Sequence, residues 1–149
     1  MKLEEEITQR KFRNDRHKLI VNILYTYGWL SAQHTQIFRK HGITTQQFNV
    51  LRILRGQHPN PTTIKLIRER MLDKMSDASR IVEKLRQKGL LVRHISNHDR
   101  RHADVFITNK GLKVLSALDK SDKIFDGHTA NLSLKETAVL NGLLDKMRG

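Results

Sequence analysis

Three charged residues, Asp99, Arg100 and Arg101, lie at the tip of a segment that reads HISNHDRRHADVFITNKG over residues 94–111. Runs rich in β-branched residues flank the tip, which predicts a β-hairpin whose charged tip lies in solvent. A guanidinium is permanently charged and long enough to enter the minor groove of a DNA duplex. We therefore predict that Arg100 and Arg101 bind DNA and that Asp99 orients one of them or caps the turn. A turn that only improves solubility is the alternative.

A second polar set lies on a predicted amphipathic helix with the sequence SDASRIVEKLRQKG, residues 76–89. Ser76 is its expected N-cap and Gly89 its expected terminator. In a helix-turn-helix protein the second helix enters the major groove, where its first residues reach the base edges. The residues of this helix that we predict to contact DNA are Ser76, Asp77, Ser79, Arg80 and Lys84.

Their side chains suit different parts of a duplex. Arg80 can bond guanine through two hydrogen bonds, and Asp77 can accept one from cytosine N4. Lys84 and Lys88, farther along, suit phosphate groups. An ordinary surface helix with a polar outer face is the alternative.

The flanking sequence predicts the elements that position these residues. Apolar residues at helical spacing predict a long helix over 14–40, and a second helix begins with a Thr44–Gln47 capping box. HPNP at 58–61 precedes a short third helix. After the hairpin, Thr108 caps another helix.

A last helix begins at a capping box formed by Ser133 and Glu136. The predicted fold is therefore mainly α with a small β-hairpin wing, in a single domain over 1–149. Residues 44–108 form a winged helix-turn-helix region in this prediction.

Charge and composition narrow the function. The chain has 28 Lys and Arg against 15 Asp and Glu, a formal net charge of +13. The excess is concentrated between Arg80 and Lys113, which favours a polyanionic partner over a merely solvated surface. No apolar run approaches the length that spans a bilayer, so we expect a cytoplasmic protein without a membrane partner.

Catalytic and metal motifs are missing from the sequence. It has no Cys, and its 8 His lack the spacing of helical zinc ligands. Gly-rich phosphate loops, nucleophile elbows and paired carboxylates are also missing. We expect no enzyme activity, no cofactor and no metal site, although a protonation-sensitive role for the wing histidines stays open.

The motifs over residues 43–111 together resemble the MarR family of winged-helix transcriptional regulators. They are the TTQQF segment at 44–48, SRIVEKLRQKGLLVR at 79–93, the Asp99-x-Arg101 pair and ITNKG at 107–111. The resemblance implies a homodimer that binds a pseudo-palindromic operator in double-stranded DNA and often releases it when a small molecule or an oxidant arrives. We expect this chain to act as a repressor. The resemblance also assigns Arg101 to the minor groove, with Asp99 as its positioning partner.

The terminal helices support dimerisation independently. Helices over 14–40 and 109–148 carry more apolar surface than a winged helix covers, so we predict that they join two copies. Two recognition helices would then lie about 34 Å apart, which predicts inverted half-sites. A monomer in which these helices fold back on their own domain is the alternative.

An effector pocket is expected between the long helix and the winged region. Its candidate residues are Tyr27, Trp29, His34, Phe38 and Phe48, although aromatic residues at helical spacing usually fill a core. Two other functions stay open: a winged helix that binds nucleic acid without sequence preference, and one that contacts only proteins.

Overall fold

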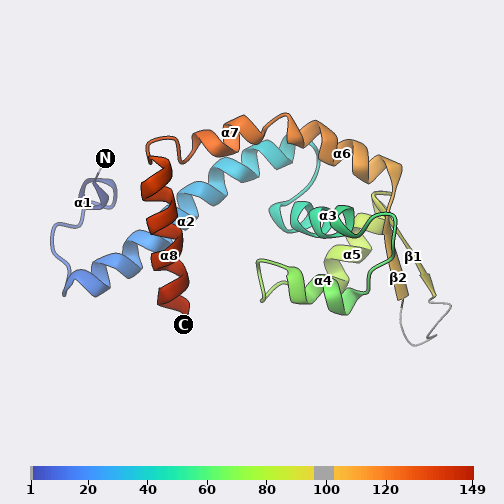
Figure 1. Ribbon diagram of the computed structural model, residues 1–149, viewed down its shortest axis with the longest axis horizontal. Helices are drawn as coiled ribbons and strands as arrows, with labels where there is room; N and C mark the ends of the chain where they lie inside the picture. The colour runs from blue at the N-terminus through green and yellow to red at the C-terminus, as the bar shows by residue number, and fades with distance from the viewer. Residues whose placement is uncertain (1, 96–102) are drawn as a thin grey trace. The chain divides into compact units, whose positions relative to one another are not determined.

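The computed structural model describes residues 2–95 and 103–149. The chain divides into two compact units, residues 1–45 and 46–149. Its elements are helices and one two-stranded antiparallel sheet (Figure 1), which confirms the predicted fold class.

The first unit is built on one long helix, α2 (Asp15–Lys40), as the sequence predicted. The side chain of Asn14 caps its start by accepting a hydrogen bond from the His17 N–H at 2.9 Å. Its end is closed by Gly42 at φ +68°, a left-handed conformation that glycine adopts without strain. Exposed apolar side chains remain along the helix at Leu19, Ile20, Leu24, Tyr27 and Trp29.

A short helix that the sequence did not indicate, α1 (Leu3–Glu6), is joined to α2 by side-chain hydrogen bonds. Lys18 forms an ion pair with Glu4, which lowers the pKa of that carboxyl. The Tyr25 hydroxyl donates a hydrogen bond of 2.7 Å to Glu6, which raises the pKa of the tyrosine. Leu3 is buried.

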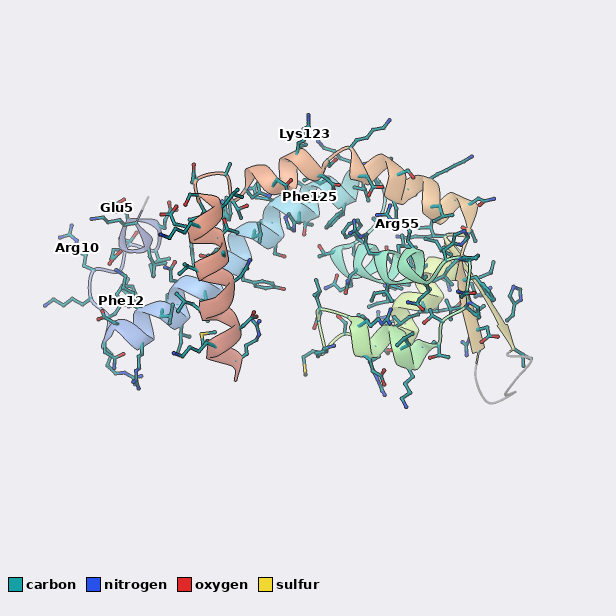
Figure 2. The ribbon with its side chains drawn as sticks, viewed as in Figure 1. Glu5, Arg10, Phe12, Arg55, Lys123 and Phe125 are labelled. Carbon is teal, nitrogen blue, oxygen red and sulfur yellow. The ribbon has the colours of Figure 1, made fainter. Side chains whose placement is uncertain are left out.

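The second unit contains the helix-turn-helix and its wing. Its elements are α3 (Thr45–Gln57), α4 (Ile64–Arg70), α5 (Ala78–Gln87), β1 (Leu91–Ile95), β2 (Ala103–Ile107), α6 (Asn109–Asp119), α7 (Asp122–Gly127) and α8 (Leu134–Arg148). α4 packs on α5 and on β2, and α5 packs on β1. Side chains of α3, α4 and α5 fill the space among these helices (Figure 2).

Apolar residues at helical spacing form the core of this unit. The largest fully buried side chains are those of Leu51, Leu54, Ile67, Met71, Leu85, Leu91, Leu115 and Leu118. They come from every element between α3 and α6 except β2, which contributes the buried Val105 and Ile107. Burial of this apolar surface is what holds the short elements together.

The hairpin is antiparallel, with Leu91 opposite Ile107 and Ile95 opposite Ala103. An additional bridge extends it: Thr62 and Val105 exchange two backbone hydrogen bonds, of 3.0 and 2.8 Å. Thr62, two residues before α4, therefore pairs with β2 through an isolated bridge. This contact ties the wing to the helix-turn-helix, and we had predicted only two strands.

α6 begins where predicted, because the Thr108 side chain accepts a hydrogen bond from the Gly111 N–H at 3.1 Å. α8 begins at the predicted capping box of Ser133 and Glu136. α7, between them, was not predicted. No helix in the described ranges is long and apolar enough to cross a membrane.

Candidate nucleic-acid interface

The helix α5 presents its polar face to solvent and its apolar face to the core. Ala78, Val82 and Leu85 are buried, whereas Ser79, Arg80, Lys84 and Gln87 are exposed. Residues 80, 84 and 87 have i, i+4, i+7 spacing and therefore share one face. The buried stripe fixes the rotation of the helix, so this face points outward.

The N-cap of α5 is Asp77, and our assignment of Ser76 was wrong. The Asp77 carboxylate accepts a hydrogen bond from the Arg80 N–H at 3.1 Å. Both residues can cap a helix, and the turn before α5 decides between them, because it uses Ser76 elsewhere. A carboxylate at a helix N-terminus is also favoured by the helix dipole.

That turn is organised around Asp73. Its two carboxylate oxygens accept hydrogen bonds from the Met75 N–H at 3.0 Å and from the Ser76 hydroxyl at 2.6 Å. The Ser76 bond, together with further hydrogen bonds, lowers the pKa of this carboxyl. On the other side of the turn, the Leu72 N–H donates to the Asn49 side chain at 2.9 Å.

Two of the predicted DNA-contacting cations are available on this face. Neither Arg80 nor Lys84 forms an ion pair with any residue in the described part of the chain. The one acidic residue within α5, Glu83, is engaged by Arg86 through two hydrogen bonds of 2.9 and 2.8 Å. This pairing lowers the pKa of Glu83 and offsets a charge that would repel phosphate.

The end of α5 is fastened to its neighbours. Gly89 has φ +70°, and the Leu90 N–H bonds the Leu85 carbonyl, as expected for a glycine terminator. The Lys88 ammonium donates to the buried Gln47 side chain at 2.8 Å, so its expected phosphate contact competes with an internal bond. Lys110 donates to the Lys88 carbonyl at 2.8 Å.

The tip of the wing lies outside the described residues. This applies to Asp99, Arg100 and Arg101, whose predicted roles stay predictions. The strands that carry the tip are described, and His94 contacts Phe106 across them with ring centroids 6.0 Å apart.

The candidate effector residues fall on different helices. Tyr27, His34 and Phe38 lie on α2, and Phe48 lies on α3. His34 and Phe38 meet edge to face at 6.1 Å. Phe38 is only 2% exposed, which supports its role as a core residue, whereas Tyr27 is exposed.

A cavity of about 380 Å³ lies within the first unit, where we had not predicted one. Leu3, Glu6, Asn22, Tyr25, Thr26 and Trp29 line it. Of these, only Trp29 was a candidate pocket residue. The other lining residues escaped prediction because α1 had no sequence signal.

Metal ligands do not gather in the described part of the chain: no group of three or more His, Asp or Glu side chains there could hold an ion.

The sequence alone did not indicate the roles of two buried polar residues, Gln47 and Thr62, which bond to Lys88 and to the wing strand β2. Gln47 was predicted only as a capping residue, and Thr62 only as the first residue of the short third helix, which in fact begins at Ile64.

Comparisons with known proteins agree with this geometry. Residues 41–102 match the family model described as MarR family. The chain is 30% identical over 115 residues to the HTH-type transcriptional regulator MhqR of Bacillus subtilis (strain 168), covering 77% of this chain and 74% of that protein.

Two solved structures share the fold. MarR from E. coli, as a cysteine-to-serine mutant complexed with operator DNA, superposes with a TM-score of 0.79 at 22% identity, covering 93% of this chain and 99% of that one. The organohalide-sensing regulator RdhR-CbdbA1625 in its 2,4-dichlorophenol-bound form gives 0.82 at 19% identity, covering 94% and 85%.

Proposed function

The chain belongs to the MarR family, and on that premise we propose that it is a sequence-specific DNA-binding transcriptional regulator. The observation that carries the proposal is the outward face of α5, where Arg80 and Lys84 are exposed and form no ion pair with a described residue. They lie on the second helix of the helix-turn-helix, which is the helix that enters the major groove in such proteins. The net charge of +13 suits a polyanionic partner.

In this proposal α5 reads base edges and the wing enters the adjacent minor groove. Arg80 bonds guanine, Ser76 and Ser79 offer hydroxyls, and Lys84 contacts phosphate. Asp77 is engaged in capping α5 through one oxygen, so its second oxygen would be the acceptor for cytosine. Arg100 and Arg101 supply the charge of the wing, and Asp99 positions them.

We further propose that the regulator acts in the cytoplasm as a homodimer that represses transcription from a pseudo-palindromic operator. The apolar side chains that remain exposed on α2 and α8 support dimerisation, because their burial is favourable. The operator complex of E. coli MarR supports the choice of DNA as partner.

The proposal also includes release of the operator DNA when a small molecule binds. The dichlorophenol-bound form of RdhR-CbdbA1625 supports it by analogy. In this chain the proposed ligand contacts are Tyr27, His34, Phe38 and Phe48, of which Tyr27 is exposed. A ligand that shifts the melting temperature and weakens operator binding would support this part.

The DNA-binding proposal is tested by selecting duplexes from a random pool with the purified full-length chain. We expect a selected duplex to bind roughly 10³-fold or more tightly than a scrambled one. Equal affinity for both would favour the module without sequence preference, and no affinity at low salt would favour the protein-contact module.

Two variants then assign the residues. Arg80→Ala should relax the preference at one base position per half-site, by about 1–3 kcal/mol. Lys113→Ala, an exposed lysine on α6, is the matched control and should leave the preference intact. If both variants change the preference equally, Arg80 does not read bases.

A further inference from the structure

An unusual apolar side chain precedes the DNA-contacting helix. Met75 lies in the turn between α4 and α5, two residues before the Asp77 cap, and is 94% exposed. Leu72, at the other end of the same turn, is 86% exposed. Large apolar side chains gain free energy when they leave water, so the exposure of Met75, the one of the two that lies closer to α5, indicates that a partner covers it.

The backbone under Met75 is held in place. Its own N–H donates to Asp73 at 3.0 Å, and the next residue, Ser76, donates through its hydroxyl to the same carboxylate at 2.6 Å. Lys74, between Asp73 and Met75, donates to the Glu69 carbonyl. The turn therefore presents the thioether from a fixed position next to the start of α5, which reduces the ordering cost of a contact.

The surroundings favour a nucleic acid as the covering partner. Lys74 directly precedes Met75 and Arg80 follows it by five residues, so cations flank the exposed side chain along the chain. In the major groove, the 5-methyl group of thymine is the apolar feature that a side chain can contact. Methionine is unbranched and polarizable, and it adapts to such a small target.

We propose that Met75 contacts the 5-methyl group of a thymine in the major groove and so determines specificity at that base pair. This inference rests on the proposed function of α5. It adds an apolar contact to the hydrogen bonds that the hydroxyl and charged side chains at the start of α5 are proposed to form with bases.

The test replaces single thymines of a selected duplex by deoxyuridine, which removes only the methyl group. With the wild-type chain we expect one thymine in each half-site whose replacement weakens binding by about 3- to 5-fold, the effect of losing one buried methyl group. With Met75→Ala the same replacement should change binding by less than about 1.5-fold, because the contact is already gone. Met75→Leu should restore part of the sensitivity.

Leu72→Ala is the matched control. It removes a similarly exposed apolar side chain from the same turn, three residues farther from α5, and should keep the wild-type response to deoxyuridine. A Met75→Ala response identical to wild type overturns the inference while leaving the proposed function intact. A wild-type chain that does not distinguish the selected duplex from a scrambled one overturns both.

Discussion

The guanidinium of Arg55 donates two hydrogen bonds to the carboxylate of Asp119, from Nη1 to Oδ2 at 2.7 Å and from Nη2 to Oδ1 at 3.0 Å. Arg55, labelled in Figure 2, lies near the end of α3, and Asp119 is the last residue of α6. The two residues are 64 positions apart in the sequence, and their contact joins α3 to α6. Its hydrogen bonds lower the pKa of Asp119 and raise that of Arg55.

Asp119→Asn should lower the free energy of unfolding by about 1 kcal/mol at pH 7, because both partners are partly exposed and solvent screens their attraction. Urea denaturation measures the change. Asp126→Asn is the matched control, since Asp126 is exposed and its carboxylate forms no ion pair with a described residue. A control that loses as much stability would show that net charge, rather than this pair, is responsible.

The same pair predicts a pH dependence. The folded-state pKa of Asp119 is lowered, so its stabilisation is complete above the unfolded pKa near 4 and is lost as pH falls through the folded value. The stability difference between wild type and Asp119→Asn should therefore be constant from pH 7 to about pH 5 and shrink below about pH 4. A difference that stays constant down to pH 3 would contradict this origin.

Gly111 is required for close packing at the start of α6. A Cβ there would lie 2.3 Å from the Leu90 carbonyl oxygen and 2.8 Å from Ile107 Cγ1. Gly111→Ala should destabilise the chain by about 2 kcal/mol or more, because backbone has to move. Gly142→Ala in α8 meets no atom within 4 Å and should be neutral or stabilising by up to about 1 kcal/mol. Thermal unfolding of both variants gives the comparison, and equal effects would refute it.

Adjacent threonines before α4 should respond in opposite directions to replacement by valine. The buried Thr62 hydroxyl has no hydrogen-bond partner among the described residues, so Thr62→Val should stabilise by about 1 kcal/mol. The Thr63 hydroxyl caps α4 by accepting from the Leu66 N–H at 3.1 Å, so Thr63→Val should destabilise by about 1 kcal/mol. Chemical denaturation distinguishes the two, and a loss of stability in Thr62→Val would reveal an unseen partner of its hydroxyl.

The apolar side chains of α8 should mediate assembly. No residue of α8 is buried within the chain, and Leu140 and Leu143 are among its exposed apolar residues. Leu143→Glu should shift the protein from dimer to monomer and weaken operator binding at least about 10-fold, because paired half-sites bind through two linked contacts. Asn141→Glu, an exposed polar position on the same helix, is the control. Sedimentation equilibrium measures the state, and a wild-type monomer would refute the proposed dimer.

Local sequence signals predicted most of the elements. The caps at Thr108 and Ser133, the terminator at Gly89 and the two strands of the hairpin each depend on a few neighbouring residues, and the structure confirms them. α1 and α7 were missed because helices of 4 and 6 residues carry too few apolar positions to show a period. The cap of α5 was misassigned because Ser76 and Asp77 are both good caps.

The sequence by itself determined the fold class, the family and the polar face of α5, because periodicity and short motifs encode them locally. Only the tertiary structure decided which polar side chains are already engaged in hydrogen bonds or ion pairs within the chain. Lys88 bonds Gln47 and Arg55 bonds Asp119, over separations of 41 and 64 residues, while Arg80 and Lys84 form no ion pair with a described residue. The physical reason is that long-range partners depend on how distant segments pack, and spacing along the chain carries no record of that.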